Sequence, residues 1–163
     1  MHYKINAQGR FKNISAIHAE QTLPIILKCG HCLQNHPKTI TLTSESRVHN
    51  DHHEKSNLKI SCKECKNSME LQIKPPTNEK VECQSSNVYR SIKISDEQFL
   101  VSEVFSKGCE VVEIPLNEFF VQDLHENIYK ANIDEDGNWV VMDRANDAII
   151  IEELSIKLEE LKH

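Results

Sequence analysis

The stretches that decide the fold of this 163-residue chain are CGHC at residues 29–32 and CKEC at residues 62–65. Two cysteines three positions apart on a tight turn can aim both sulfur atoms at one ion, and a second such turn completes a tetrahedron of thiolates. The pattern therefore predicts one structural Zn²⁺ in a four-cysteine site. Its expected ligands are Cys29, Cys32, Cys62 and Cys65.

Other interpretations of these cysteines stay open. Iron in a rubredoxin-like site uses the same ligands, and the pairs could also form a redox-active or transient metal site. Four thiolates leave no open coordination position, which disfavours catalytic zinc. His31 is the alternative ligand, although we expect it to face solvent on the turn. Gly30 is expected to provide a positive φ angle there.

Strand-like runs flank each pair, and apolar and polar residues alternate in three of the four. Residues 24–28 lead into the first pair and residues 38–42 follow it, while residues 58–62 and 69–73 flank the second. A period of two predicts β-strands. Each C-x-x-C pair therefore joins two strands that pair as a hairpin, which is the arrangement of a zinc ribbon.

The segment between the two hairpins, residues 44–57, is polar and has no apolar period. We interpret it as a mobile loop. His49, His52 and His53 lie in it, and three histidines this close could form a second, weak metal site. An exposed polar loop is the favoured interpretation.

The prolines at 75 and 76 predict a boundary between a zinc-binding β half, residues 1–75, and a metal-free β half, residues 76–163. The second half contains further strand-like runs and a turn at residues 134–138. Leucines at 154, 158 and 161 have a spacing that fits one or two helical turns at the C-terminus. Cys83 and Cys109 are unpaired in sequence and are expected to be small buried hydrophobic residues.

Charge is distributed unevenly along the chain. The net charge is −6, with +5 on residues 1–75 and −11 on residues 76–163. The acidic half would repel a polyanion, so nucleic acid is a disfavoured partner, and a protein partner with a basic patch is expected. The chain has no long apolar run and no apolar N-terminal leader, so we expect a cytoplasmic, or also nuclear, monomer that does not contact membranes.

Motifs for catalysis are missing from the sequence. It contains no P-loop, G-x-G-x-x-G, G-x-S-x-G or H-E-x-x-H motif, so no catalytic residue is assigned. The expected function is therefore that of a non-enzymatic zinc protein that acts as a protein-interaction module. A nucleic-acid-binding zinc ribbon and a metal-handling or thiol-redox protein are the alternatives.

Four stretches spread along the chain resemble the eukaryotic family of CxxC-motif-containing zinc-binding proteins. LKCGHC at residues 27–32 and CKECKNS at residues 62–68 are similar to the two cysteine turns of that family. FSKGCEVV at residues 105–112 and WVVMD at residues 139–143 are similar to its two later motifs. Lys107 replaces the usual arginine, and Val141 and Met142 replace an aspartate and a tyrosine.

This resemblance implies a mainly β fold made of two similar antiparallel, sandwich-like halves, with zinc bound only in the first. It carries the four cysteines over as ligands and implies no established catalytic activity.

Overall fold

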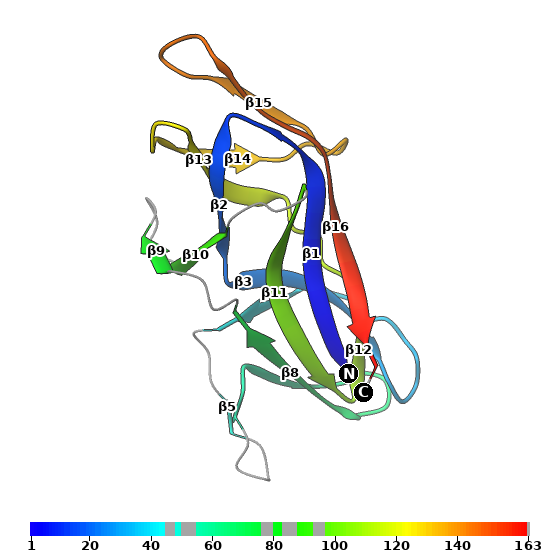
Figure 1. Ribbon diagram of the computed structural model, residues 1–163. Coiled ribbons are helices and arrows are strands. Elements are labelled where there is room, and N and C mark those ends of the chain that lie inside the picture. The colour runs from blue at the N-terminus through cyan, green and yellow to red at the C-terminus, as the bar shows by residue number, and fades with distance from the viewer. Residues whose placement is uncertain (45–47, 50–54, 76–79, 83–87, 93–96, 163) are drawn as a thin grey trace.

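The computed structural model describes residues 1–44, 48–49, 55–75, 80–82, 88–92 and 97–162, and within them the chain is built from antiparallel β-strands (Figure 1). The expected mainly β fold class is therefore confirmed. The described ranges contain no helix long and apolar enough to cross a lipid bilayer.

The strands form four sheets. The six-stranded sheet has the order β15 (Trp139–Met142), β16 (Ala148–Leu161), β1 (His2–Lys12), β11 (Gln98–Lys107), β8 (Ser68–Lys74), β7 (Leu58–Ser61). The five-stranded sheet has the order β14 (Ile128–Asn132), β13 (Glu118–Asp123), β2 (Ile14–Glu20), β10 (Val88–Ile92), β9 (Lys80–Glu82). The three-stranded sheet has the order β12 (Cys109–Glu113), β3 (Thr22–Cys29), β4 (Ile40–Thr43), and β5 (Val48–His49) pairs with β6 (Lys55–Ser56).

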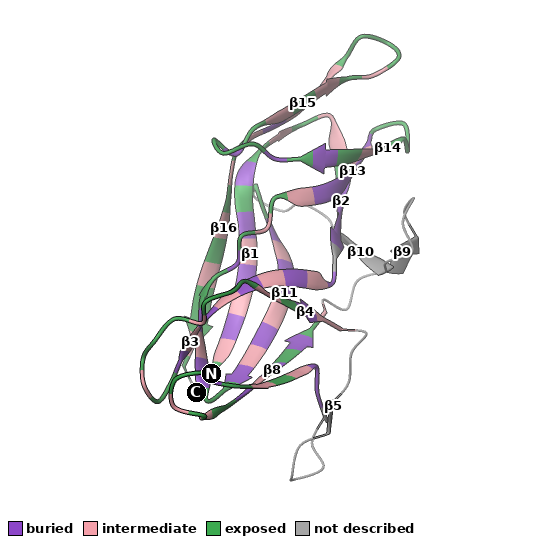
Figure 2. Ribbon diagram, turned by 180° about the vertical axis from the view of Figure 1, so that it is seen from behind, coloured by how far each residue is buried: buried purple, intermediate pink, exposed green. Residues whose placement is uncertain are grey.

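The alternation seen in the sequence becomes alternating burial along the strands (Figure 2). In β3, Leu23, Ile25 and Leu27 are fully buried, while the residues between them are partly exposed. Cys29 continues the same two-residue period, so its side chain lies on the core side of the strand. The predicted hairpins are also present, because β3 pairs with β4 and β7 pairs with β8.

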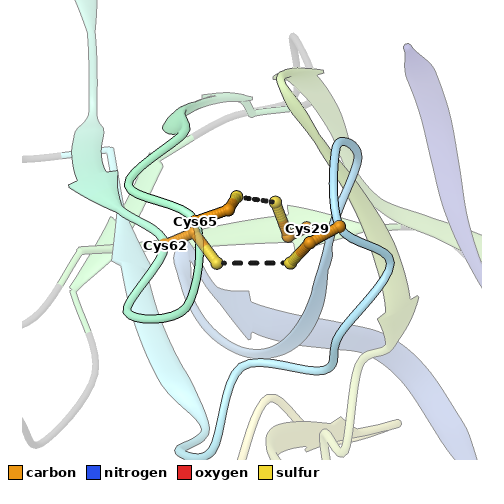
Figure 3. Close-up of side chains that lie close together, drawn as sticks. Cys29, Cys62 and Cys65 are labelled. Carbon is orange, nitrogen blue, oxygen red and sulfur yellow. Dashed lines mark hydrogen bonds between the residues drawn. The ribbon is translucent and has the colours of Figure 1, made fainter.

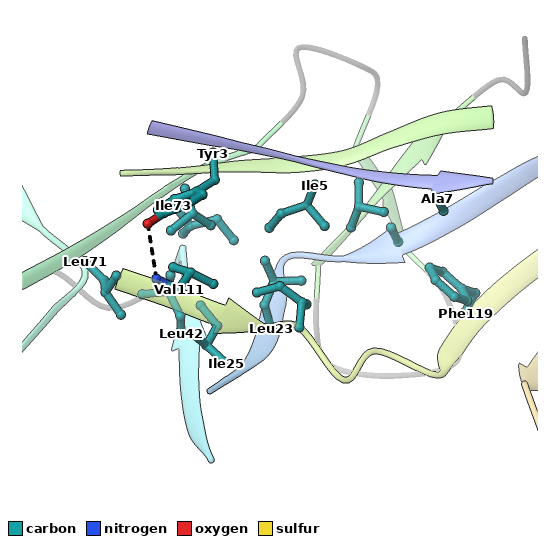
Figure 4. Close-up of a cluster of buried hydrophobic side chains, with 14 of the residues drawn as sticks. Tyr3, Ile5, Ala7, Leu23, Ile25, Leu42, Leu71, Ile73, Val111 and Phe119 are labelled. Atoms are coloured by element: carbon teal, nitrogen blue, oxygen red, sulfur yellow. Dashed lines mark hydrogen bonds between the residues drawn. The ribbon is translucent and has the colours of Figure 1, made fainter. Parts of the chain in front are cut away.

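Strands from residues 1–75 and 76–163 share the sheets and the core. In the six-stranded sheet β1 lies between β16 and β11, and β8 pairs with β11. Figure 4 shows the shared core, in which the hydroxyl oxygen of Tyr3 accepts a hydrogen bond from the backbone N–H of Val111 at 3.3 Å. Apolar burial therefore joins the two parts into one packed unit. The predicted domain boundary itself stays a prediction.

The C-terminal segment is a strand, and the expected helix is wrong. Residues 148–161 form β16, which pairs with β1 from Lys12↔Ile150 to His2↔Leu161. Leu154, Ile156 and Leu158 lie on the side that packs against the core. The segment fits both the two-residue period of a strand and the leucine spacing of a helix. Pairing with β1 stabilises the strand.

Part of the polar segment at residues 44–57 is also ordered into strands, since β5 and β6 pair there. His52 and His53 lie outside the described residues, as does Cys83. The turn at residues 134–138 is confirmed. Gly137 has a φ of 81°, and its N–H donates to the carbonyl oxygen of Asp134 at 3.0 Å.

His18 in β2 gives the fold a pH-dependent stability. The side chain is buried, its Nε2 donates to Gln122 Oε1 at 3.2 Å, and its Nδ1 has no hydrogen-bond partner in the part of the chain that the structure describes. Burial lowers the pKa of His18 below its usual 6.5. The unfolded chain therefore binds a proton more readily than the folded protein once the pH falls below 6.5.

We expect the free energy of unfolding to decrease as the pH falls from 6.5 toward the lower folded-state pKa of His18. A His18→Gln variant, which cannot be protonated, should show a shallower decrease. Urea unfolding of both zinc-loaded proteins at several pH values measures this difference. Equal slopes for the two proteins would rule out His18 as the titrating group.

Candidate metal centre

Four sulfur atoms from the two predicted turns meet at one point. The Sγ atoms of Cys29, Cys32, Cys62 and Cys65 all lie within 4.8 Å of one another. Cys29 Sγ is 3.6 Å from Cys65 Sγ, and Cys32 Sγ is 3.6 Å from Cys62 Sγ (Figure 3). All four cysteines are free thiols, so no disulfide competes for these sulfur atoms.

These distances match the size of a tetrahedral zinc site. Sulfur atoms at about 2.3 Å from a central Zn²⁺ lie about 3.8 Å apart at the corners of a regular tetrahedron. The sulfur cluster needs only small adjustments to reach that geometry. The donor set of four soft thiolates also suits zinc chemically.

Both cysteine turns have the same backbone. The N–H of Leu33 donates to the carbonyl oxygen of Cys29 at 3.1 Å, and the N–H of Lys66 donates to that of Cys62 at 3.0 Å. Leu33 has a φ of 63° and Lys66 a φ of 66°. The left-handed residue of each turn therefore follows its second cysteine, and the expectation that Gly30 provides the positive φ is wrong.

Gly30 instead lies in close contact with another part of the chain. Its N–H donates to the carbonyl oxygen of Gly108 at 3.0 Å, and a Cβ atom at residue 30 would lie 3.1 Å from that oxygen. A side chain there would push the first turn away from Gly108.

Gly108 forms the corner at which the chain passes from one sheet to another. This corner places the two cysteine turns side by side. It joins β11, which pairs with β8, to β12, which pairs with β3. Cys109 of β12 lies opposite Cys29 of β3, and Lys107 of β11 lies opposite Glu70 of β8. The end of β3 and the start of β8 must therefore meet beside Gly108, and each of these ends carries a cysteine turn.

Asn67 connects the second turn to the first. Its Nδ2 donates to Gly108 O at 3.0 Å and lies 3.7 Å from Cys29 Sγ, a contact in which it donates to sulfur. Gly108 O thus accepts hydrogen bonds from both turns. The prediction from cysteine spacing gave no role to Asn67 or Gly108, although both lie in stretches that resemble the family, at residues 62–68 and 105–112.

Local N–H groups favour the thiolate form of two cysteines. The backbone N–H of Cys32 lowers the pKa of Cys29 to about 6, assisted by the N–H of His31, which lies 3.4 Å from Cys29 Sγ. The N–H groups of Cys65 and Glu64 lower the pKa of Cys62 in the same way. Metal ligation requires thiolates, so these amides prepare the site for a cation.

The side chains of the remaining candidates are not part of the sulfur cluster. His31 is exposed, and the sulfur cluster is complete without it. Cys109 is buried and is not part of the cluster, as expected for a small hydrophobic residue, and burial raises the pKa of its thiol to about 11.

We expect Asn67→Ala to weaken zinc binding by roughly 10- to 100-fold, because groups that hydrogen-bond to metal ligands typically contribute this much to affinity. Competition with a chromophoric chelator measures the change. Asn132→Ala, an exposed position on β14, is the matched control and should leave the affinity unaltered. Equal affinities of the two variants would show that Asn67 does not orient Cys29.

Comparison with known proteins places this site in a family context. The family described as CXXC motif containing zinc binding protein, eukaryotic, matches residues 4–159. An uncharacterized protein of Encephalitozoon cuniculi (strain GB-M1) is 32% identical over 129 residues, which cover 70% of this chain and 72% of that protein.

Two solved structures share the fold. The crystal structure of C1orf123 has a TM-score of 0.74 at 14% identity and covers 99% of this chain and 100% of that chain. A hypothetical protein from Plasmodium falciparum has a TM-score of 0.73 at 14% identity and covers 98% of this chain and 99% of that chain. The family match extends over nearly the whole sequence and includes all four clustered cysteines. The chain therefore belongs to the eukaryotic family of CXXC-motif-containing zinc-binding proteins.

Proposed function

We propose that this protein is a non-enzymatic, cytoplasmic protein-interaction module held together by one structural Zn²⁺ on Cys29, Cys32, Cys62 and Cys65. The observation that carries the proposal is the position of the sulfur cluster. It lies where the ends of β3 and β8 meet the corner at Gly108, and hydrogen bonds link all three segments there. An ion at this point would stabilise the contact between two sheets.

The surroundings of the cluster support a structural role. The cavity beside Cys29 and Cys62 has a volume of about 120 Å³. Pockets for small-molecule substrates typically have volumes of about 300 Å³ or more. Four thiolate ligands would also fill the coordination sphere of zinc and leave no position for substrate or water.

The buried carboxylate of the described core also has a structural explanation. Asp123 accepts hydrogen bonds from the N–H groups of His125 and Asn127, from the Asn127 side chain and from the Tyr129 hydroxyl group. These contacts close the turn between β13 and β14. Its oxygen atoms are therefore engaged in stabilising this turn.

Metal analysis combined with zinc release tests the structural role. We expect one zinc ion per chain and slow release to a competing chelator, accompanied by a large fall in the thermal unfolding temperature measured by circular dichroism. Slow release follows because the ligands come from two turns that must separate before the ion escapes. Complete zinc loss with an unchanged unfolding temperature would contradict the structural role.

Metal handling is the second candidate function, and one observation favours it. Cys32 and Cys65 are partly exposed, so a competing ligand has a route to two of the four sulfur atoms. This function predicts rapid zinc exchange and an unfolding temperature that changes little when zinc leaves. The release experiment distinguishes the two functions because they predict opposite rates and opposite structural consequences.

A further inference from the structure

The outer edge of β16 is open along its C-terminal part. β15 pairs with β16 only from Met142↔Ala148 to Trp139↔Ile151. Glu153 then has a φ of 53°, and the Leu154 N–H donates to the carbonyl oxygen of Gly137 at 2.9 Å. From residue 155 to residue 161 β16 pairs with β1 on one side, and in the described ranges no strand pairs with its other side.

A groove with a volume of about 590 Å³ lies beside this open edge. We call it the β16 groove and define it by residues 112–117, residues 133–135, Gly137 and three side chains of β16, which are Leu154, Ile156 and Leu158. β12 and the segment that follows it border the groove opposite β16. β12 pairs only with β3 among the described strands. The N–H of its Val111 donates to the Tyr3 hydroxyl oxygen and the carbonyl oxygen of its Cys109 accepts from Ser106 Oγ, so β12 borders the groove without offering a free edge.

The lining of the β16 groove is apolar at its floor and acidic at its rim. Leu154, Ile156 and Leu158 are only partly buried, and they alternate with exposed residues along β16, as the colours of Figure 2 show. Glu113, Asp134 and Glu135 are exposed at the rim. The described lining contains no Lys or Arg to neutralise them.

The exposed apolar residues of β15 are a weaker candidate for binding. Val140 and Met142 are largely exposed on this edge strand. The groove next to β15 contains Glu152 and Glu153, but Arg10 already forms ion pairs with both of them. Asp134 also borders this groove, but Arg10 offsets part of its negative charge, whereas the described lining of the β16 groove contains no Lys or Arg.

We propose that the β16 groove binds an extended segment of a partner protein in which Lys or Arg alternates with aliphatic residues, added as a strand along the outer edge of β16. This inference rests on the proposed function as an interaction module and gives that function a site. Main-chain hydrogen bonds to a strand edge supply affinity in such complexes, and alternate side chains supply specificity.

The dimensions and charges of the groove suit this ligand. Residues 155–161 span about 23 Å at a strand rise of about 3.3 Å per residue, which is the length of a seven-residue extended segment. Alternate side chains of an added strand point to opposite faces, so the Lys and Arg residues of such a segment would face the groove, with their methylene stems over the floor at Ile156 and Leu158. Its basic side chains would project toward Glu113 and Glu135, and the acidic second half of the chain would steer it toward the groove.

The test uses zinc-loaded protein and the synthetic peptide acetyl-Lys-Val-Lys-Ile-Arg-Val-Lys-amide. We expect saturable binding, with amide chemical-shift changes concentrated at residues 112–117 and 154–161. Glu113→Lys combined with Glu135→Lys should weaken binding at least tenfold. Glu126→Lys combined with Asp147→Lys makes the same charge change at exposed turn residues outside the groove and should bind as the unmodified protein does.

Two further peptides separate strand addition from charge alone. A peptide with Glu at every basic position should not bind, and a peptide with Pro in place of both Val residues should bind at least tenfold more weakly, because Pro cannot donate to a strand edge. Equal binding by the Pro peptide, shifts centred on β15, or dimerisation of the chain through β16 would overturn the proposal. Circular dichroism and zinc content of the same samples show whether the structural zinc role holds, so the two proposals can fail separately.

Discussion

A Cys65→Ser variant is expected to lose zinc and to unfold at a much lower temperature than the unmodified protein. Serine keeps the size of the side chain but removes one of the four sulfur atoms that lie within 4.8 Å of one another. Structural zinc in small peptides contributes an apparent binding free energy of about 10–16 kcal/mol at neutral pH. The shared core of this protein provides stability of its own, so we expect a folded but strongly destabilised chain.

The loss of zinc should act on the whole molecule. β8 begins two residues after Lys66 and lies in the same sheet as β1, β11 and β16. We therefore expect one cooperative thermal transition, displaced to lower temperature, in place of separate unfolding of residues 1–75. Elemental analysis together with thermal unfolding followed by circular dichroism measures both effects.

Cys109→Ser is the matched control. Cys109 is buried opposite Cys29 in the β3–β12 pair, but its sulfur atom is outside the cluster. This variant should keep a full complement of zinc and lose only about 1–3 kcal/mol, because it places a hydroxyl group in a buried position. If Cys109→Ser lost zinc as readily as Cys65→Ser, the assignment of the four ligands would be wrong.

The meeting of the four cysteines could be predicted from the sequence because ligand type and spacing determine it locally. Each C-x-x-C turn fixes its own two sulfur atoms, and zinc chemistry requires a second pair. The hairpins were predictable for the same reason, since alternation at residues 38–42, 58–62 and 69–73 indicates the buried face of those strands. Both the cysteine spacing and the alternation are patterns among residues close together in the sequence.

The contacts that hold the two turns against each other depend on residues far apart in sequence. Gly108 is 41 residues from Asn67, yet its carbonyl oxygen accepts hydrogen bonds from Asn67 Nδ2 and from Gly30 N–H. No local period reports such a contact. The C-terminal strand was missed for a related reason, because Leu154, Leu158 and Leu161 fit a helix until pairing with β1 is known. Long-range pairing overrides local preference in both cases.

Gly108→Ala is expected to damage the metal site from the second half of the chain. Gly108 has a φ of 78°, a left-handed conformation that costs a residue with a Cβ atom about 1–2 kcal/mol. A Cβ atom there would also collide with the carbonyl oxygen of Ser68, the first residue of β8. Relief of this collision must move β8 or the corner, and either movement lengthens the hydrogen bonds that Gly108 O accepts from Gly30 and Asn67.

We therefore expect Gly108→Ala to lose about 2–4 kcal/mol of stability and to bind zinc roughly 10- to 100-fold more weakly. Gly137→Ala separates strain from metal binding, because Gly137 has a φ of 81° and a Cβ atom there would lie 2.5 Å from Leu154 N, in a turn outside the metal centre. This control should be destabilised to a similar degree and keep the zinc affinity of the unmodified protein. Urea unfolding and chelator competition measure the two quantities. An unchanged zinc affinity in Gly108→Ala would mean that the strain caused by the alanine side chain moves neither pair of cysteines. The corner at Gly108 would then not position the cysteine turns.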